Sequence, residues 1–215
     1  MKTNRQPSKL GLTMVEMIVV LTILVAVTAG VVALTAPTFT ENAKDTATTL
    51  SLQELKNLIM GHASQQGYWD DMDEYPRPSA LAVSSGHRSN HPQLAMLFVN
   101  PDSYTAGGDE VDTNTFDPAT KNGWRKGGYV QQATGTYTVN VAAGFTALYG
   151  NDGDKAVLDG WGNPIVLQEP TGGTATEKIY SARLVSAGPN GILETDGVNA
   201  VPVTTGDDIV LYLRK

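Results

Sequence analysis

The chain has 215 residues, a formal net charge of -7 and no cysteine. An acidic chain lacks the basic surface that binds phosphate backbones, so we expect no nucleic-acid partner. Because no disulfide can form, any constraint on the loops has to come from packing, hydrogen bonds or a bound ion.

The N-terminal region joins a short basic leader to a long uncharged run. The leader holds three basic residues and no acid up to Gly11, and no charged residue occurs from Met17 to Thr40. A helix of roughly 20 apolar residues crosses a bilayer, so this run predicts a single membrane-spanning helix with the basic leader on the cytoplasmic side. Glu16 stands at the start of the apolar segment, where a carboxylate is costly and therefore marks a function.

The segment Gly11-Leu12-Thr13-Met14-Val15-Glu16 resembles the processing signal of type IV pilins and type II secretion pseudopilins. The resemblance implies cleavage after Gly11 by a prepilin peptidase, N-methylation of the new N-terminal Leu12, and a role for Glu16 in filament assembly. The family usually starts its mature chain with Phe, where this chain has Leu12. A free amine on Leu12, from the same chain or a neighbouring subunit, is the natural partner of the Glu16 carboxylate. Cleavage removes three positive charges and no acid, which takes the net charge from -7 to -10.

Two other interpretations of this region stay open. One is an ordinary signal anchor that tolerates an acid, and the other is a secretory signal cut at the small residues near Ala33 and Ala36. The uncharged run is longer than the roughly 7–15 apolar residues of a secretory signal. Cleavage near Ala36 also leaves Glu16 without a role, so we favour processing at Gly11.

Residues 12 to about 66 predict one long helix. The expected organisation is a leader (1–11), a membrane and filament-core helix (12–36), its amphipathic continuation (37–66) and a globular head (67–215). Pro37 is expected to kink the helix near the end of the apolar run. Apolar residues spaced mostly three or four apart form a stripe expected to cover a C-terminal sheet: Ala43, Ala47, Leu50, Leu55, Leu58, Ile59 and His62 or Ala63.

The head divides into a loop-rich part and a strand-rich part. Residues 67–128 carry many turn signals, so we expect surface insertions there, with the acids at 70–74 solvated. Alternating and apolar runs then predict strands. The fold class is therefore α+β, a pilin fold with a long N-terminal helix packed on a small antiparallel sheet. The predicted strands cover residues 137–141, 164–168, 179–185 and 208–213.

Two C-terminal motifs carry a narrower resemblance to the major pseudopilin of type II secretion. Asp159-Gly160-Trp161-Gly162-Asn163-Pro164 is similar to a turn of that protein, and residues 186–191, followed by Asp207-Asp208-Ile209, resemble its calcium-binding loop. Calcium takes about six to eight oxygen ligands. The resemblance implies calcium as a cofactor, with Asn190, Asp196 and Asp208 as candidate ligands and Glu194 or Asp207 as alternatives.

An acidic turn without a metal is the open alternative for this loop, because Asn190-Gly191 is by itself a hairpin signal. Asn190 stands where the family has an aspartate, so one negative charge is missing and binding should be weaker. Two other candidate metal sites have weaker support. His87 and His91 lie in a loop-like segment, and residues 151–154 lack the glutamate that ends a calcium loop. Trp124 and Trp161 are expected to be packing residues.

These features predict a structural subunit of a type II secretion pseudopilus or related type IV filament, and not an enzyme. Expected partners are other copies of the chain, pilin-like subunits, the prepilin peptidase and the inner-membrane assembly platform. The precursor is expected in the inner membrane with a periplasmic head, before it enters the filament. The alternatives are a type IV pilin or minor pilin with a surface-adhesion role, and a signal-anchored extracytoplasmic binding domain or enzyme.

Overall fold

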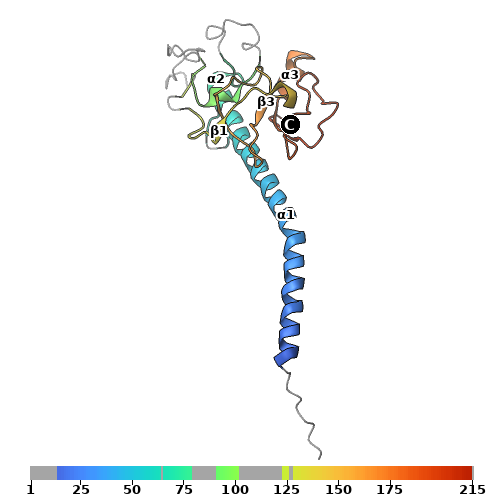
Figure 1. Cartoon of the computed structure of the whole chain (residues 1–215). Coiled ribbons are helices and arrows are strands. Elements are labelled where there is room, and N and C mark those ends of the chain that lie inside the picture. Colours follow the sequence, from blue (N-terminus) through green and yellow to red (C-terminus); the bar gives the residue numbers. More distant parts are fainter. Residues whose placement is uncertain (1–13, 64, 79–90, 102–122, 126–127, 215) are drawn as a thin grey trace, which may run out of the picture. The chain divides into compact units, whose positions relative to one another are not determined.

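The computed structural model describes residues 14–214 except 64, 79–90, 102–122 and 126–127, and omits the side chains of residues 31–37. The chain divides into two compact units, Met1–Ala43 and Lys44–Lys215. Helix α1, Met14–Met60, contributes to both (Figure 1). The described residues confirm the expected α+β class, with helices and small antiparallel sheets. None of the described helices combines the length and apolar character that crossing a membrane requires.

Helix α1 ends at Met60, earlier than the expected end near residue 66. Gly61 follows it with φ +79° and donates its N–H to the carbonyl of Asn57 at 2.8 Å. A glycine in this left-handed conformation closes a helix without the steric penalty of a side chain. The returning chain then passes so close that a Cβ on Gly67 would overlap the backbone of Gly61.

One face of α1 is buried within the second unit. Thr48, Leu52, Leu55 and Ile59 are only 0–2% exposed. Their spacing of four, three and four residues keeps them on a single stripe of the helix. The sequence pattern also placed Ala43, Ala47, Leu50 and His62 or Ala63 on this stripe, which is wrong, because all of these are exposed. Leu50 is 65% exposed. Two residues rotate a helix by about 200°, so Leu50 and the buried Leu52 face opposite ways.

The main sheet has three antiparallel strands in the order β3-β4-β5: Val166–Gln168, Arg183–Ser186 and Ile209–Tyr212. Leu184 of β4 pairs with Leu167 on one side and with Leu211 on the other. All of β3 and β4 is buried, whereas β5 is half-buried along its length. The strands expected over 164–168 and 208–213 are thus confirmed in most of their length, and the one expected over 179–185 is confirmed from Arg183 on.

The strand predicted over 179–185 is wrong at its beginning, because Ala175–Ser181 forms helix α3. Thr174 and Glu177 cap each other: the Glu177 N–H donates to Thr174 Oγ1 at 3.3 Å, and the Thr174 N–H donates to Glu177 Oε2 at 2.7 Å. This reciprocal capping starts a helix just ahead of β4.

The strand predicted over 137–141 is wrong. The nearby strand β1, Gly135–Thr136, ends before this range and pairs with β2, Lys155–Ala156. The short 3₁₀ helix η2, Val141–Ala143, begins at its end. Asn140 caps η2 by accepting the N–H of Ala143 at 3.3 Å. An asparagine that offers its own side chain to the backbone competes with strand pairing.

The core lies between the buried stripe of α1 and the three-stranded sheet. Helix α2, Tyr68–Met72, and the 3₁₀ helix η1, Leu94–Leu97, contribute to it. Tyr68, Tyr75 and Trp124 are 0–8% exposed in the same cluster. Residues 67–128, expected to be loop-rich with surface insertions, therefore also supply buried side chains to the core. A second, smaller cluster packs on the other face of the sheet around Tyr137, Phe145, Ala156, Val166, Val185 and Ala187.

Candidate functional site

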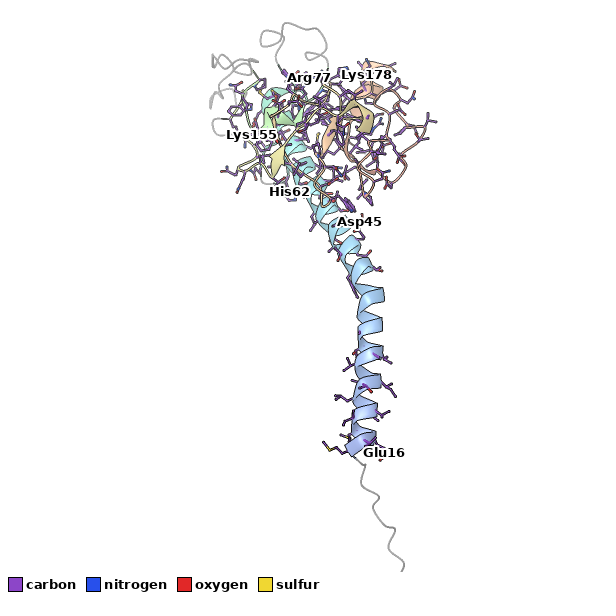
Figure 2. The ribbon with its side chains drawn as sticks, in the orientation of Figure 1. Glu16, Asp45, His62, Arg77, Lys155 and Lys178 are labelled. Carbon is purple, nitrogen blue, oxygen red and sulfur yellow. The ribbon has the colours of Figure 1, made fainter. Side chains whose placement is uncertain are left out.

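Two regions carry the predicted functional residues, and the first is the beginning of α1. Gly11 and Leu12 lie outside the described residues. Glu16 lies in the first turn of α1, where a negative charge is favoured by the helix dipole (Figure 2). All side chains of residues 14–30 are exposed, and Glu16 is the one charged residue among them. Large apolar side chains such as Leu21 and Leu24 are 64% and 59% exposed.

The second region is the connection between β4 and β5, residues 187–208. It brings together the carboxylates of Glu194, Asp207 and Asp208, which we call the acidic group. One oxygen of each lies within 4.8 Å of the others. Asn190 joins them, since its Nδ2 donates to Glu194 Oε2 at 3.3 Å and its backbone N–H donates to Asp207 Oδ2 at 3.2 Å. Of the predicted ligands, Asn190 and Asp208 are therefore together with the alternatives Glu194 and Asp207.

Asp208 is the least exposed member of the acidic group. Its Oδ2 accepts the backbone N–H of Glu194 at 2.9 Å and of Thr195 at 2.6 Å. Its Oδ1 is buried and accepts no hydrogen bond from the described residues. Burial raises the pKa of the Asp208 carboxyl, and the backbone N–H groups of Thr195 and Glu194 offset part of that rise.

Two glycines allow the two ends of the β4–β5 connection to approach each other closely. Gly206 has φ +52°, and a Cβ there would overlap the carboxylate of Glu194. Gly188 has φ +62°, and a Cβ there would overlap the carbonyl oxygen of Asp207. Glycine tolerates both the left-handed conformation and the close approach. The two ends of the β4–β5 connection are thus held against each other.

Asp196 lies apart from the acidic group. Its Oδ1 accepts the N–H groups of Val198 and Asn199 at 3.0 and 2.8 Å, and its Oδ2 accepts that of Val203 at 3.2 Å. Burial opposes ionisation, but these backbone donors outweigh it and lower the pKa of Asp196. The side chain organises a turn in residues 196–203.

Arg183, in β4, is a residue whose role the sequence analysis missed. It is completely buried, and it donates to Gln168 Oε1 at 3.0 Å and to the carbonyls of Asn199 and Ala200 at 3.1 and 3.2 Å. It also donates to the carbonyl of Asp196. One cation therefore fixes the middle of the β4–β5 connection to the sheet. The signal was a lone arginine inside the apolar run at 182–185.

The turn at Asp159–Pro164 connects two other parts of the second unit, α1 and β4. Asp159 Oδ1 accepts the N–H groups of Trp161 and Asn163 at 2.9 and 2.8 Å, and its Oδ2 accepts the hydroxyl of Ser186 at 2.7 Å. The N–H of Gly160 donates to Thr48 Oγ1 on α1 at 2.8 Å. The turn thereby joins the helix to the end of β4, which leads into the acidic group.

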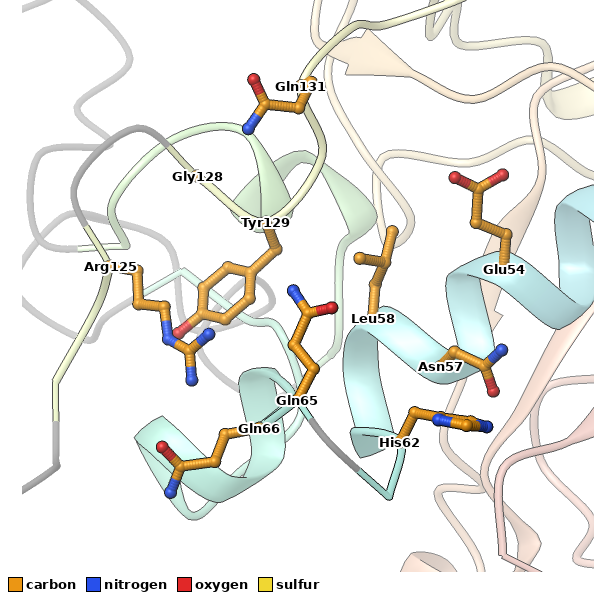
Figure 3. A pocket seen from close by; sticks show the side chains of 10 residues that line it. All are labelled: Glu54, Asn57, Leu58, His62, Gln65, Gln66, Arg125, Gly128, Tyr129 and Gln131. Carbon is orange, nitrogen blue, oxygen red and sulfur yellow. The ribbon is translucent and has the colours of Figure 1, made fainter.

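A polar pocket of about 480 Å³ lies beside the end of α1 (Figure 3). Figure 3 shows the amides of Gln65, Gln66 and Gln131 and the ring of Tyr129 around it. Its described lining residues include no serine, threonine or cysteine that could act as a nucleophile. The lining consists of Glu54, Asn57, Leu58, His62, Gln65, Gln66, Arg125, Gly128, Tyr129 and Gln131.

Asp71, one of the acids expected to be solvated, is buried instead. It forms an ion pair with Arg125 at 2.6 Å and accepts the hydroxyl of Tyr129 at 2.8 Å. Burial, followed by the hydrogen bond to Asp71, raises the pKa of Tyr129 strongly. This buried network holds Arg125 and Tyr129 against Asp71 of α2, which is a structural role.

Of the other candidates, residues 151–154 form a turn and Trp124 is a packing residue. His87 lies outside the described residues, so a metal site at His87 and His91 stays a hypothesis. In the turn at 151–154, Asp152 accepts the N–H of Val139 and Asp154 accepts that of Asn151, both at 2.7 Å. Trp124 is 8% exposed and donates its Nε1–H to the carbonyl of Met96 at 3.2 Å, which confirms a packing role.

Comparison of the chain with protein-family models, curated proteins and solved structures finds no match.

Proposed function

We propose that the chain is a structural subunit of a type II secretion pseudopilus or a related type IV filament, assembled through its N-terminal helix. The observation that carries the proposal is a helix segment, residues 14–30, whose side chains are exposed, mostly apolar and uncharged apart from the single acid Glu16 in the first turn. Exposed apolar surface of this extent marks contact with a membrane or another protein. The segment follows the processing signal at Gly11 and Leu12.

The proposed route begins with a precursor in the inner membrane, its head in the periplasm. The prepilin peptidase cuts after Gly11, which frees the amine of Leu12 for methylation. An N-terminal amine has a pKa of about 7.7–8.0 and is positively charged at neutral pH, and methylation keeps that charge. In a setting of low dielectric constant, Glu16 needs such a cation. Pairing with the amine of a neighbouring subunit sets the axial register of the filament.

The head has a mechanical role in this proposal. Helices of neighbouring subunits form the filament core, and the heads, residues 67–215, form its outer surface. Partners are copies of this chain, other pilin-like subunits and the assembly platform. A mechanical role of this kind requires no catalytic residues in the head.

Calcium binding at the acidic group is a second, separate proposal. Three carboxylates lie together, and Asp208 Oδ1 is a buried oxygen that accepts no hydrogen bond from the described residues. An unsatisfied buried oxygen is costly, and a cation is the kind of partner that would satisfy it. Glu194, Asp207 and Asp208 would hold the ion, with Asn190 as a neutral neighbour. The ion would neutralise like charges and join the two ends of the β4–β5 connection.

The test of the filament proposal is the mature N-terminus, read by mass spectrometry of the membrane fraction. A chain that begins at methylated Leu12 supports the proposal. A chain that begins near Pro37, or one that keeps Met1, overturns it and favours a secreted or anchored domain. Substitution of Glu16 separates the two further, since an anchored enzyme or binding domain would keep its activity without this acid.

A further inference from the structure

We propose that Asn190, in the Asn190-Gly191 pair of the β4–β5 connection, is a deamidation site that the folded chain itself promotes. The reaction converts a neutral amide into a carboxylate beside Glu194, Asp207 and Asp208. Asn190 is exposed, so water reaches it. The inference goes beyond the filament assignment and does not depend on it, because it needs only the geometry of this loop.

The chemistry balances with water as the one co-reactant. The backbone nitrogen of Gly191 attacks Cγ of Asn190, and a new N–Cγ bond closes a succinimide ring. The bond from Cγ to Nδ2 breaks, and Nδ2 leaves as ammonia with the proton that the Gly191 nitrogen gives up. Water then opens the ring at either carbonyl, which leaves aspartate or isoaspartate. Glycine is the residue that hinders this attack least, since it has no Cβ.

The fold places a hydrogen-bond donor on the oxygen where negative charge develops. The backbone N–H of Ile192 donates to Asn190 Oδ1 at 2.6 Å, which is a short bond. As Gly191 attacks, Cγ becomes tetrahedral and Oδ1 takes on negative charge. A fixed N–H at this oxygen stabilises that charge in the way an oxyanion hole does.

The fold also orients the leaving nitrogen. Glu194 Oε2 accepts from Asn190 Nδ2 at 3.3 Å, so the amide is held with Nδ2 toward the carboxylate and Oδ1 toward the N–H of Ile192. The negative charge of Glu194 stabilises the positive charge that Nδ2 gains as it leaves. The attacking nitrogen is weakly held, since the N–H of Gly191 donates to the carbonyl of Gly188 at 3.3 Å, beyond the usual range. The backbone of Asn190 is fixed by its bond to Asp207 Oδ2 at 3.2 Å.

The product changes the acidic group. A fourth carboxylate replaces an amide that donated to Glu194, so repulsion between like charges increases in the absence of a cation. In the presence of a divalent cation, the same carboxylate is an additional charged oxygen ligand. Deamidation would therefore make the order of the β4–β5 connection depend more strongly on divalent cations as the protein ages.

The experiment incubates the purified full-length chain at mildly alkaline pH, with and without urea, and follows Asn190 by peptide mass spectrometry that separates aspartate from isoaspartate. We expect Asn190 to convert in the folded chain at least as fast as in urea. The pair Asn122-Gly123 reports the intrinsic rate in the unfolded chain. A folded chain that protects Asn190 relative to urea overturns the proposal, whatever the variants do.

Two matched variants test the assigned groups. Glu194→Gln removes the charge beside Nδ2 and should slow conversion about tenfold, less than the roughly 10²–10³-fold cost of losing an oxyanion-hole donor in an enzyme. Asp196→Asn removes the same charge from the same loop, but its hydrogen bonds go to the N–H groups of Val198, Asn199 and Val203, so it should not slow the reaction. Circular dichroism confirms that both remain folded. An equal response to the two substitutions would mean that charge alone sets the rate, and it would contradict the role of Glu194.

Discussion

The two halves of α1 use the same kinds of apolar side chain in opposite ways. In residues 14–30, the first half, Leu21 and Leu24 are 64% and 59% exposed, and every side chain is accessible. In residues 44–60, the second half, Leu52 and Leu55 are 1% and 2% exposed within a single stripe. Each half is described within its own unit. One continuous helix thus carries an unburied apolar surface and a fully buried one.

This contrast separates the residues that stabilise the head from those that stay exposed. Burial of apolar surface contributes about 25 cal/mol per Å², and the buried stripe of the second half contributes it to the head core. The side chains of residues 14–30 are all exposed, so under the proposed function their apolar surface is available to lipid or to neighbouring subunits. Substitutions in the first half should affect assembly, and substitutions in the second half should affect folding.

The largest expected effect is the loss of filaments in Glu16→Ala. Removing one partner of a buried ion pair costs about 3–5 kcal/mol at each subunit contact, which is enough to prevent assembly. The head should unfold at the same urea concentration as in the wild type. Electron microscopy of the sheared fraction measures filaments, and tryptophan fluorescence measures unfolding.

Glu41→Ala is the matched control for Glu16, since it removes an exposed acid from the same helix outside the apolar run. Filaments should persist in this variant. Normal filaments in Glu16→Ala would contradict the assembly role. A shift of the urea midpoint in that variant would contradict the division of labour between the halves.

The next largest effect should come from Arg183→Met, which probes the head alone. Methionine fills part of the volume but leaves Gln168 Oε1 and three backbone carbonyls without their donor. Buried acceptors that lose a charged donor should together lower the free energy of unfolding by about 3–5 kcal/mol. Urea unfolding of the full-length chain in detergent measures this.

Lys155→Met provides the comparison for Arg183, because Lys155 is an exposed cation on β2. Its effect on the free energy of unfolding should stay within about 0.5 kcal/mol. If both variants unfolded alike, Arg183 would not be the residue that fixes the β4–β5 connection.

The register of the buried stripe is tested by the pair Leu55→Ala and Leu50→Ala. Leu55 is 2% exposed in the core, so its truncation should lower the free energy of unfolding by about 2–5 kcal/mol. Leu50 is 65% exposed, and its truncation should change stability by less than about 0.5 kcal/mol. Equal losses would place both leucines in the core and contradict the observed register.

Sequence patterns predicted the fold where one periodicity dominates. The long helix and the strands containing Leu167, Leu184 and Leu211 follow from apolar runs, and the structure confirms them. The stripe on α1 failed at Leu50, because several apolar residues lie within one turn of each other and pattern alone cannot rank them. The strand start at 179 failed because the Thr174–Glu177 cap outweighs the β-propensity of the residues that follow.

The sequence predicted which residue types form the candidate site. It did not determine which of the acids lie together. Acids near residues 194–208 were identified, but whether Glu194 or Asp196 joins Asp208 depends on how the intervening loop folds. Arg183 determines the outcome, because it donates to the carbonyl of Asp196 and so fixes that residue to the sheet. Glu194 then accepts the backbone N–H of Asp207. Similarly, Asp71 is buried by a partner 54 residues away, and local sequence does not show such a pairing.

The smallest expected effect concerns pH and Asp208. Because burial raises the pKa of its carboxyl, the folded state binds this proton more tightly than the unfolded state does. Its contribution to stability is therefore fully present below the unfolded pKa of about 3.9 and declines as pH rises through the folded pKa. With a chelator at neutral pH, Asp208→Asn should raise the free energy of unfolding by only about 0.5 kcal/mol, since the group is partly solvated.

Asp196→Asn should behave in the opposite sense, which makes it a strict control. Backbone donors lower the pKa of Asp196, so its charged form contributes stability above the unfolded pKa and loses it as pH falls through the folded pKa. Removing that charge should lower the free energy of unfolding by a few tenths of a kcal/mol at neutral pH, as for other exposed charges. The loss should be smaller in acid. Urea midpoints at acidic and neutral pH measure both variants.

Calcium should reverse the order of the urea midpoints of the wild type and Asp208→Asn, because only the wild type keeps the third carboxylate. If calcium shifts the two midpoints equally, the acidic group is a plain turn, and the head is held together by Arg183 without an ion.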